Sequence, residues 1–360
     1  MKHLIDPTDL TRAETDEIVA LGEAMYANPA AYAETMRHRK LGTLFYEPST
    51  RTRLSFTAAM MELGGNVLGF ADATNASVAK GESVGDTARV ISCFADILAI
   101  RHPVEGAPFE ASMTSLVPVI NAGDGSHNHP TQTLTDLITI QKELGRLDHL
   151  TVGCCGDLRY GRTVHSLIKA MARYEGVRFV LISPEELRLP EDFRREVCEK
   201  GSIACREVTS IEEAISDLDV LYMTRVQKER FPSQEEYERV KDCFVLDAAK
   251  MALAKERMAV LHPLPRVNEI AVEVDADPRA AYFRQVEYGK FVRMALITKL
   301  LEWKDRDTPS HRGLFSDATL RCTNPKCITN ADPRTPRRFR RQPDGTLVCA
   351  CCDAKAASLK

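Results

Sequence analysis

Four consecutive residues, Ser49-Thr50-Arg51-Thr52, combine three hydroxyl groups with one guanidinium. They follow an apolar run that predicts a buried strand at 41–46, and they precede a pattern typical of a helix at 54–63. A turn between a strand and a helix presents the unpaired amides and the positive dipole end of that helix. Hydroxyls and a guanidinium there would add donors for phosphate oxygens. The sequence therefore predicts an anion site, with a solvated helix cap as the plainer alternative.

Other polar side chains stand where further predicted strands end. In open parallel sheets, ligands bind beyond the carboxyl ends of the strands, so these residues are expected to converge on one ligand. They are Arg101, His129, Arg162, Arg225 and His262. Arg162 and Arg225, together with Gln227, are interpreted as a fork for a substrate that carries carboxylates, although either arginine alone could be a surface residue.

A rival enzyme class is suggested by residues 156–163, which differ by one residue from the phosphate-binding loop of nucleotide hydrolases. Residues 244–247 resemble the apolar strand and aspartate that accompany such a loop. However, Arg162 stands where a compact lysine is needed, and arginine is not an equivalent substitute. This alternative would also leave residues 49–52 unexplained, so it is disfavoured.

The pair His127-x-His129 could indicate a metal site, but no set of partner ligands follows at a suitable spacing. His129 precedes a predicted helix that begins at residue 130 or 131. It is therefore interpreted as a donor aimed at an oxygen atom, with Gln132 one turn along the helix.

Strands that alternate with helices predict an α/β protein with parallel sheets covered on both faces. A break near Gly145 predicts two doubly wound domains with a cleft between them. We expect the first domain at 1–145, with a returning helix at 288–304, and the second at 146–287. A length of 360 residues is sufficient for both cores.

Composition places the chain among ordinary globular proteins, with 44% hydrophobic and 28% charged residues. The chain contains neither a signal-like apolar stretch at its start nor a run long enough to span a membrane, so a cytoplasmic location is expected. Residues 1–304 carry 37 basic and 45 acidic side chains, whereas residues 305–360 carry 11 and 6. The six cysteines before residue 305 are expected to be reduced thiols, mostly buried.

The remaining five cysteines lie near the C-terminus. Cys322-x4-Cys327 and Cys349-x2-Cys352 predict a structural zinc site with four cysteine ligands, with Cys351 as an alternative to Cys352. We expect a linker at 305–318 and a small zinc-ribbon-like domain at 319–360 that needs its metal to fold.

The arginines between the two cysteine pairs allow three interpretations: a solvated loop, docking on the acidic body, or binding of nucleic acid. The near absence of stacking aromatic residues argues against nucleic acid.

Taken together, the motifs resemble the aspartate carbamoyltransferase catalytic chain over about residues 3–304. The tail resembles the zinc domain of the regulatory chain of the same family. The motifs that carry the first resemblance are Ser49–Arg53, Arg101–Pro103, His129–Gln132, Asp157–Arg162, Tyr222–Gln227 and His262–Arg266. Residues 225–227 and Pro263 favour aspartate over ornithine as acceptor, which leaves an ornithine-type transcarbamylase as the alternative.

The resemblance implies transfer of the carbamoyl group of carbamoyl phosphate to the amine of L-aspartate, in pyrimidine biosynthesis. The products are N-carbamoyl-L-aspartate and phosphate, and catalysis needs no cofactor. The family's catalytic residues correspond to Arg51, Thr52, Lys80, Arg101, His129 and Gln132. Its substrate-binding residues correspond to Ser49, Thr50, Ser77, Arg162, Arg225, Gln227, Leu264 and Pro265.

Within that assignment, residues 49–52 and Arg101 bind phosphate, and Thr52, Arg101 and His129 polarise the carbamoyl carbonyl. Ser77 and Lys80 would come from a neighbouring subunit, which implies a homo-oligomer, either a trimer or a dimer of trimers, with shared sites. The loop around Lys80 is one residue shorter than in some relatives. The regulatory chain's nucleotide-binding domain has no counterpart, so the tail is assigned a docking or assembly role. Binding of a separate regulatory chain stays open, and no membrane partner is implied.

Overall fold

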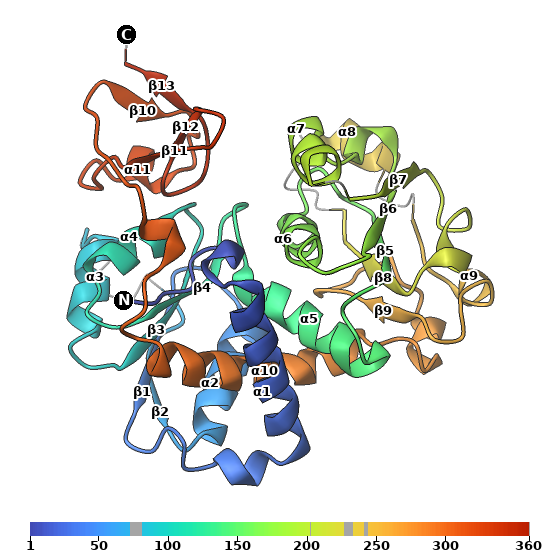
Figure 1. The fold of residues 1–360 in the computed structure, drawn as a ribbon, viewed down its shortest axis with the longest axis horizontal. Helices are drawn as coiled ribbons and strands as arrows, with labels where there is room; N and C mark the ends of the chain where they lie inside the picture. The colour runs from blue at the N-terminus through green and yellow to red at the C-terminus, as the bar shows by residue number, and fades with distance from the viewer. Residues whose placement is uncertain (73–80, 202, 227–232, 241–243, 360) are drawn as a thin grey trace. The chain divides into compact units, whose positions relative to one another are not determined.

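The computed structural model describes residues 1–72, 81–201, 203–226, 233–240 and 244–359. The chain divides into two compact units, each described here by itself (Figure 1). Unit 1 comprises Met1–Thr131 and Lys290–Lys360, and unit 2 comprises Gln132–Gly289. Helix α5 (Pro130–Leu144) leads from unit 1 into unit 2, and α10 (Tyr282–Glu302) leads back. None of the helices in the described ranges is long and apolar enough to cross a lipid bilayer.

Unit 1 contains a parallel sheet of order β2-β1-β3-β4. The chain winds from β1 through a helix to β2 and, on the other side, from β3 through a helix to β4. The winding therefore reverses between β1 and β3, which is where an open α/β sheet binds its ligand. The elements are α1 (Arg12–Ala27), β1 (Lys40–Phe45), α2 (Thr50–Glu62), β2 (Asn66–Phe70), α3 (Val84–Ile91), β3 (Ile97–His102), α4 (Ala107–Thr114) and β4 (Val119–Asp124).

Unit 2 repeats this plan with a parallel sheet of order β7-β6-β5-β8-β9, whose winding reverses between β5 and β8. Helices α6 and α9 cover opposite faces of the sheet (Figure 1). The elements are β5 (Thr151–Cys155), α6 (Arg162–Met171), β6 (Arg178–Ile182), α7 (Glu191–Arg194), β7 (Cys205–Val208), β8 (Val220–Met223), α8 (Gln234–Val240), α9 (Ala248–Met251) and β9 (Ala259–Leu261).

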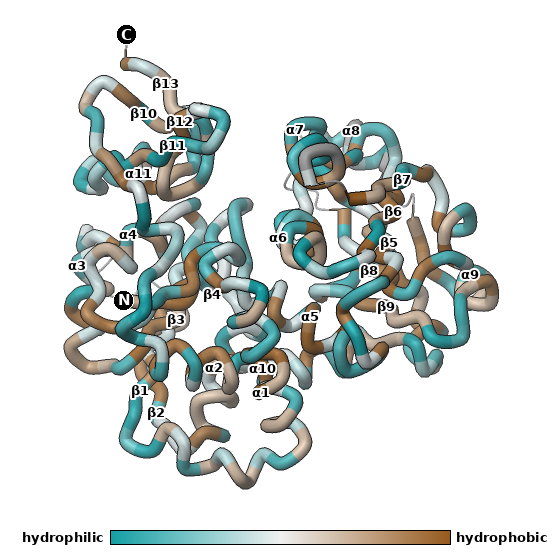
Figure 2. Tube along the Cα trace, in the orientation of Figure 1, coloured by the Kyte–Doolittle hydropathy of each residue, from teal (hydrophilic) through white to brown (hydrophobic). Residues whose placement is uncertain are grey.

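The central strands of both sheets are apolar because helices cover both faces of each sheet. Every residue of β5 is buried, and β8 is buried along its whole length (Figure 2). The predicted α/β class with two parallel sheets is confirmed.

Residues 319–359, here called the C-terminal module, belong to unit 1. Their strands form two antiparallel pairs, β10 (Leu320–Cys322) with β13 (Ala356–Ser358), and β11 (Phe339–Arg341) with β12 (Leu347–Cys349). A short helix, α11 (Ile328–Ala331), follows the second cysteine. The segment before the module packs against the N-terminus. Ser310 donates from its backbone amide to Asp9 Oδ1 at 2.8 Å, and the His3 amide donates to Thr308 Oγ1 at 2.7 Å.

Several predicted elements were wrong in detail. The sequence of residues 185–200 is helix-like and would predict one helix, but a single helix does not form there, because Pro190 lacks an amide hydrogen and α7 begins only after it. Residues 244–247 form no strand but one bridge, Leu246 with Ile270, before α9. The returning helix begins at Tyr282 rather than near residue 288, and α4 and the edge strand β7 were not predicted.

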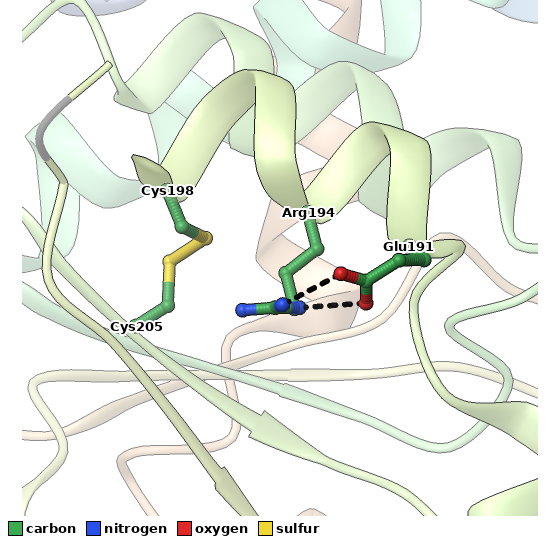
Figure 3. Close-up of a disulfide and its surroundings, with 4 residues drawn as sticks. All are labelled: Glu191, Arg194, Cys198 and Cys205. Carbon is green, nitrogen blue, oxygen red and sulfur yellow. Dashed lines mark hydrogen bonds and ion pairs between the residues drawn. A yellow bond between two sulfur atoms is a disulfide. The ribbon is translucent and has the colours of Figure 1, made fainter. Parts of the chain in front are cut away.

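Cys198 and Cys205 are joined by a disulfide, so the expectation of reduced thiols is wrong for this pair (Figure 3). Their Cα atoms lie 5.9 Å apart, where the end of a helical segment meets the start of β7. Because β7 was not predicted, the sequence offered no reason to place these cysteines side by side. Among the other cysteines of the first 304 residues, Cys154 and Cys155 are buried and free, whereas Cys93 is exposed.

Candidate active site

The turn at residues 49–52 lies directly beyond β1, at the carboxyl end of the strand. Ser49 is the N-cap of α2, yet within the described residues its hydroxyl caps no amide of the helix. Thr52 is buried in the first helical turn, and Arg51 is exposed. The turn thus places amides, hydroxyls and a guanidinium in one helical turn, and these are the groups that an anion site requires.

A second guanidinium lies beside this turn. Arg101 ends β3 in register with Phe45 of β1, and its Nε donates to Glu47 Oε1 at 2.7 Å. Partial desolvation of the side chain, followed by the nearby charge of Arg101, lowers the pKa of Arg51. Two cations held this close favour an anion between them, and Glu47 fixes one of them. Sequence analysis missed Glu47, whose only signal is its position in the same turn.

The third polar segment of unit 1, the loop 125–129, follows β4. His129 is buried, and its Nδ1 lies 3.3 Å from Thr131 Oγ1. Asp124 holds the two ends of the loop together. Its carboxylate accepts hydrogen bonds from the backbone amides of Gly106 at 2.8 Å and Asn128 at 3.0 Å. These bonds fix the backbone that carries His129.

Gln132 lies in the first turn of α5 and is held by a residue that sequence analysis missed. Its Nε2 donates to Asp136 Oδ1 at 2.7 Å, and Gln285 donates to the same oxygen at 2.6 Å. The spacing of four residues on one helix face is the signal that could have identified Asp136.

In unit 2, Arg162 and Arg225 both lie beyond the strands at which the winding reverses. Arg162 begins α6 after β5, and Arg225 follows β8; both are half-buried. Thr224 links the two loops, since its Oγ1 accepts from the Asp157 amide at 2.9 Å. Gly156, with φ at 109°, lies so close to Thr224 that a Cβ there would be 2.5 Å from its carbonyl oxygen.

The turn that follows β9 carries Leu264 and Pro265, which are joined by a cis peptide bond. His262 Nδ1 accepts from the Leu264 amide at 2.7 Å, and its Nε2 lies 2.7 Å from Glu269 Oε1. Both His262 and Glu269 are buried, so this chain of bonds fixes the carbonyls of the turn. Glu269 was also missed from the sequence.

Three predicted site residues, Ser77, Lys80 and Gln227, lie outside the described residues. Of the other predicted residues, 49–52 and Arg101 lie at the reversal point of the unit 1 sheet, and Arg162 and Arg225 at that of the unit 2 sheet. His129 and Gln132 instead follow the edge strand β4, and Leu264 and Pro265 follow the edge strand β9.

The rival interpretations lose support from local geometry. Asp247, the expected acidic partner of a nucleotide hydrolase, caps α9 through the Lys250 amide at 2.9 Å and pairs with the Lys250 ammonium at 2.6 Å. Both ring nitrogens of His127 lie against carboxylates, Asp124 at 3.1 Å and Asp353 at 3.2 Å. A metal bound by His127 would have to displace one of these contacts.

The C-terminal module brings together the four predicted ligands Cys322, Cys327, Cys349 and Cys352, all buried. Their sulfur atoms lie within 4.8 Å of one another, with pairs at 3.5 and 3.7 Å. A tetrahedral zinc with bonds of about 2.3 Å separates its ligand atoms by about 3.8 Å, so the cage fits this ion. Cys351 is not in the cluster; it packs against Gly106 instead.

Hydrogen bonds donated to the cysteine sulfur atoms also suit a bound metal. The Asn324 amide donates to Cys322 Sγ at 3.4 Å, and Thr329 Oγ1 donates to Cys327 Sγ at 3.3 Å. Such donors stabilise thiolate ligands and fix their orientation.

Three family models match the chain. Residues 2–142 match the carbamoyl-P binding domain of aspartate/ornithine carbamoyltransferase, and residues 148–300 match its Asp/Orn binding domain. Residues 316–358 match the metal binding domain of the aspartate carbamoyltransferase regulatory chain.

Among relatives, an aspartate carbamoyltransferase catalytic subunit from Lachnoclostridium phytofermentans is 63% identical over 84% of this chain and 98% of its own length. The catalytic subunit of M. jannaschii aspartate transcarbamoylase is similar in structure, with a TM-score of 0.79 and 48% identity over 85% of this chain and 100% of that one. The enzyme from Trypanosoma cruzi in complex with N-(phosphonacetyl)-L-aspartic acid has a TM-score of 0.78 and 40% identity, over 82% of this chain and 95% of that one. The chain therefore belongs to the aspartate carbamoyltransferase catalytic-subunit family, with a regulatory-chain metal-binding domain at its C-terminus.

Proposed function

We propose that the chain catalyses carbamoyl transfer from carbamoyl phosphate to the amine of L-aspartate, which gives N-carbamoyl-L-aspartate and phosphate. The observation that carries the proposal is the placement of basic and hydroxyl groups at the winding reversal of both sheets. Unit 1 offers donors for a phosphate and a carbonyl, and unit 2 offers guanidiniums for carboxylates. Solved T. cruzi structures of the same family hold carbamoyl phosphate and aspartate, which supports this pair of substrates.

In the first half of the site, the amides and hydroxyls of residues 49–52 and the guanidiniums of Arg51 and Arg101 bind the phosphate. Thr52, Arg101 and His129 donate to the carbamoyl oxygen, where negative charge develops as the amine attacks. Gln132 and the carbonyls of Leu264 and Pro265 orient the carbamoyl amide. Their supports, Asp136 and His262, keep these groups fixed before substrate arrives.

In the second half, Arg162, Arg225 and Gln227 bind the two carboxylates of aspartate. The amine of aspartate attacks in its neutral form, and phosphate is the leaving group and the acceptor of the amine's proton. The protein's main task is then to hold two anions together against their mutual repulsion. A metal has no part in this chemistry; the cysteine cage would hold zinc as a structural ion.

A side-by-side assay tests the acceptor. With carbamoyl phosphate fixed, the purified chain should carbamoylate L-aspartate and leave L-ornithine unchanged. Preference for ornithine would replace the aspartate assignment with the ornithine alternative. Hydrolysis of ATP without carbamoyl transfer would revive the nucleotide-hydrolase interpretation.

We further propose a homotrimer, or a dimer of trimers, in which Ser77 and Lys80 complete the site of a neighbouring subunit, and a cytoplasmic location. Mixing a Lys80→Ala chain with an Arg51→Gln chain tests the shared site. If sites are shared, mixed oligomers regain activity that neither variant has alone.

The C-terminal module is proposed to dock in cis rather than to bind nucleic acid. Arg338 pairs with the nearly buried Glu110 at 2.8 Å, and the backbones of Glu105 and Ile328 are joined at 2.9 Å. The module's cysteines share an apolar cluster with Ala107 and Phe109 of α4. Filter binding to DNA and RNA at low salt should therefore show no steep salt-dependent affinity.

A further inference from the structure

The loop 125–129 of unit 1, which leads into His129, receives a charged side chain from the C-terminal module. His127 Nε2 lies 3.2 Å from Asp353 Oδ2, which is 226 residues away in sequence. Asp353 directly follows the last cysteine of the metal cage. The family assignment gives His127 no role, although it stands two residues before His129.

The opposite side of the imidazole is held by unit 1 itself. His127 Nδ1 lies 3.1 Å from Asp124 Oδ2, and the exposed fraction of the Asp124 side chain is 1%. His127 is therefore clamped between two carboxylates. Although burial lowers the pKa of His127, Asp124 and Asp353 outweigh that effect and hold this pKa well above its usual value. The ring is then a cation, with an N–H for each carboxylate.

The contacts of His127 with Asp124 and Asp353 hold the backbone that leads into His129. Asp124 accepts from the Asn128 amide, and the Asp124 amide donates to the Asn128 carbonyl at 3.2 Å. Asn128 is also tied to the N-terminus, since its Nδ2 donates to Asp6 Oδ2 at 2.7 Å. Every residue from Asp124 to Asn128 thus lies within one hydrogen-bonded turn, and His127 is the member that reaches the module.

A divalent cation is a poor alternative at this cluster. Oxygen or nitrogen atoms of Asp6, His127 and Asp353 do lie within 4.8 Å of one another. However, both nitrogens of His127 already face carboxylates, and Asp6 accepts from Asn128 and Thr8.

We propose that Asp353 of the C-terminal module is a positioning residue for carbamoyl transfer, which acts through His127 to hold the His129 loop. This inference rests on the proposed function. It gives the module a direct role in the active site of its own chain. The module is then more than a docking element.

The test is a double-mutant cycle in the full-length, metal-loaded protein. Asp353 has φ at 58°, a conformation that asparagine tolerates, so Asp353→Asn keeps the shape and removes the charge. We expect kcat to fall roughly fivefold, with the KM for carbamoyl phosphate changed less than about twofold, because the phosphate is held by other elements. In a His127→Asn background, Asp353→Asn should change kcat less than about 1.5-fold.

Asp344→Asn is the matched control, because Asp344 lies in an exposed turn of the same module and contacts the Thr346 amide. It should leave kcat unchanged. Equal fold reductions by Asp353→Asn in both backgrounds, or an unchanged kcat, would overturn the proposal. If Asp353→Asn loses its metal, the metal-bound His127→Asn variant must show the lowered kcat instead.

Hydrogen exchange separates this proposal from the proposed function. Amides of residues 125–129 and 131 should exchange faster in Asp353→Asn than in Asp344→Asn, whether or not the wild type transfers carbamoyl groups. Unchanged exchange would count against positioning, whereas absent transfer with faster exchange would count against the proposed function only.

Discussion

The turn at residues 49–52 and the C-terminal module both carry arginine among polar groups, yet the contacts of their arginines differ. In the turn, the described residues offer the Arg51 side chain no hydrogen bond or ion pair, and Ser49 leaves its hydroxyl free of any capping bond. In the module, Arg338 contacts Glu110, Arg334 contacts the Gly81 carbonyl and Arg340 contacts Asp353. The Arg51 charge, which the described residues leave unneutralised, is therefore a better indication of a ligand site than the number of arginines.

Replacing Arg51 should have the largest effect on activity. We expect Arg51→Gln to lower kcat/KM for carbamoyl phosphate about 10³-fold, because a charged donor to phosphate is lost from a preorganised site. The free energy of unfolding should change by less than about 0.5 kcal/mol, since the side chain is exposed. Steady-state kinetics and urea denaturation measure the two quantities.

Arg37→Gln is the control for that experiment. Arg37 is an exposed arginine of the same unit, and its guanidinium pairs with a surface glutamate, Glu34, at 3.6 Å. An equal loss of activity in Arg37→Gln would mean that overall charge, rather than the turn, governs substrate binding.

Unit 2 extends the comparison to the second substrate. Arg225→Gln should raise the KM for aspartate about 10²-fold, because a charged hydrogen bond to a carboxylate is lost, and should leave the KM for carbamoyl phosphate nearly unchanged. Initial rates at varied aspartate measure this. Arg206→Gln is the control: it removes an exposed arginine paired with Asp217 and should leave both KM values at their wild-type levels. If Arg225→Gln also raised the KM for carbamoyl phosphate, the proposal that unit 1 binds phosphate and unit 2 binds aspartate would be contradicted.

The folding of the C-terminal module should depend on its metal rather than on its arginines. Cys327→Ser, or a strong chelator, should unfold residues 319–359 and leave the two sheets folded, because the metal ligands hold most of that small core. Activity should fall about fivefold to tenfold through the His129 loop. Metal analysis, with about one zinc expected per chain, and hydrogen exchange follow the change.

Cys93→Ser is the matched control, since Cys93 is an exposed free thiol of unit 1. It should keep the metal and the activity. Retention of zinc by Cys327→Ser would indicate that Cys351 serves as a ligand after all.

Local patterns predicted those parts of the molecule whose geometry is set by nearby residues. The metal cage was predicted correctly because the short spacing of Cys322 and Cys327 brings both sulfur atoms to one metal. The strand, turn and helix around Ser49 were also predicted correctly, because their order is visible in adjacent residues. Contacts made across the fold left no such signal. Glu47 orients Arg101, and Gln285 reaches Asp136, only once strands pair and helices pack. The disulfide of Cys198 depends on β7, a strand too short and polar to show the period of a buried strand.

The smallest predicted effect lies where the segment before the module meets the N-terminus. The buried His3 Nδ1 accepts from the Val119 amide at 2.9 Å, and its ring centre is 5.1 Å from that of His311. Burial, followed by the charges of His311 and the terminal amine, lowers the pKa of His3 to about 3. Between about pH 6.5 and pH 3 the unfolded chain binds a proton at His3 that the folded chain does not, so stability falls as pH is lowered.

For His3 alone, the free energy of unfolding should decrease by about 2 kcal/mol between pH 6.5 and pH 5. Urea denaturation of wild type and His3→Gln at pH 7, 6 and 5 measures the slope, with exposed His38→Gln as the control. His3→Gln carries a constant penalty for its altered packing, but its stability should depend less on pH than that of the wild type. Equal slopes for the two proteins would show that His3 titrates normally, and hence that the contact between the N-terminus and the segment before the module is open to water. In that case the module would be joined more loosely to unit 1 than its contacts with Glu110 and Glu105 imply.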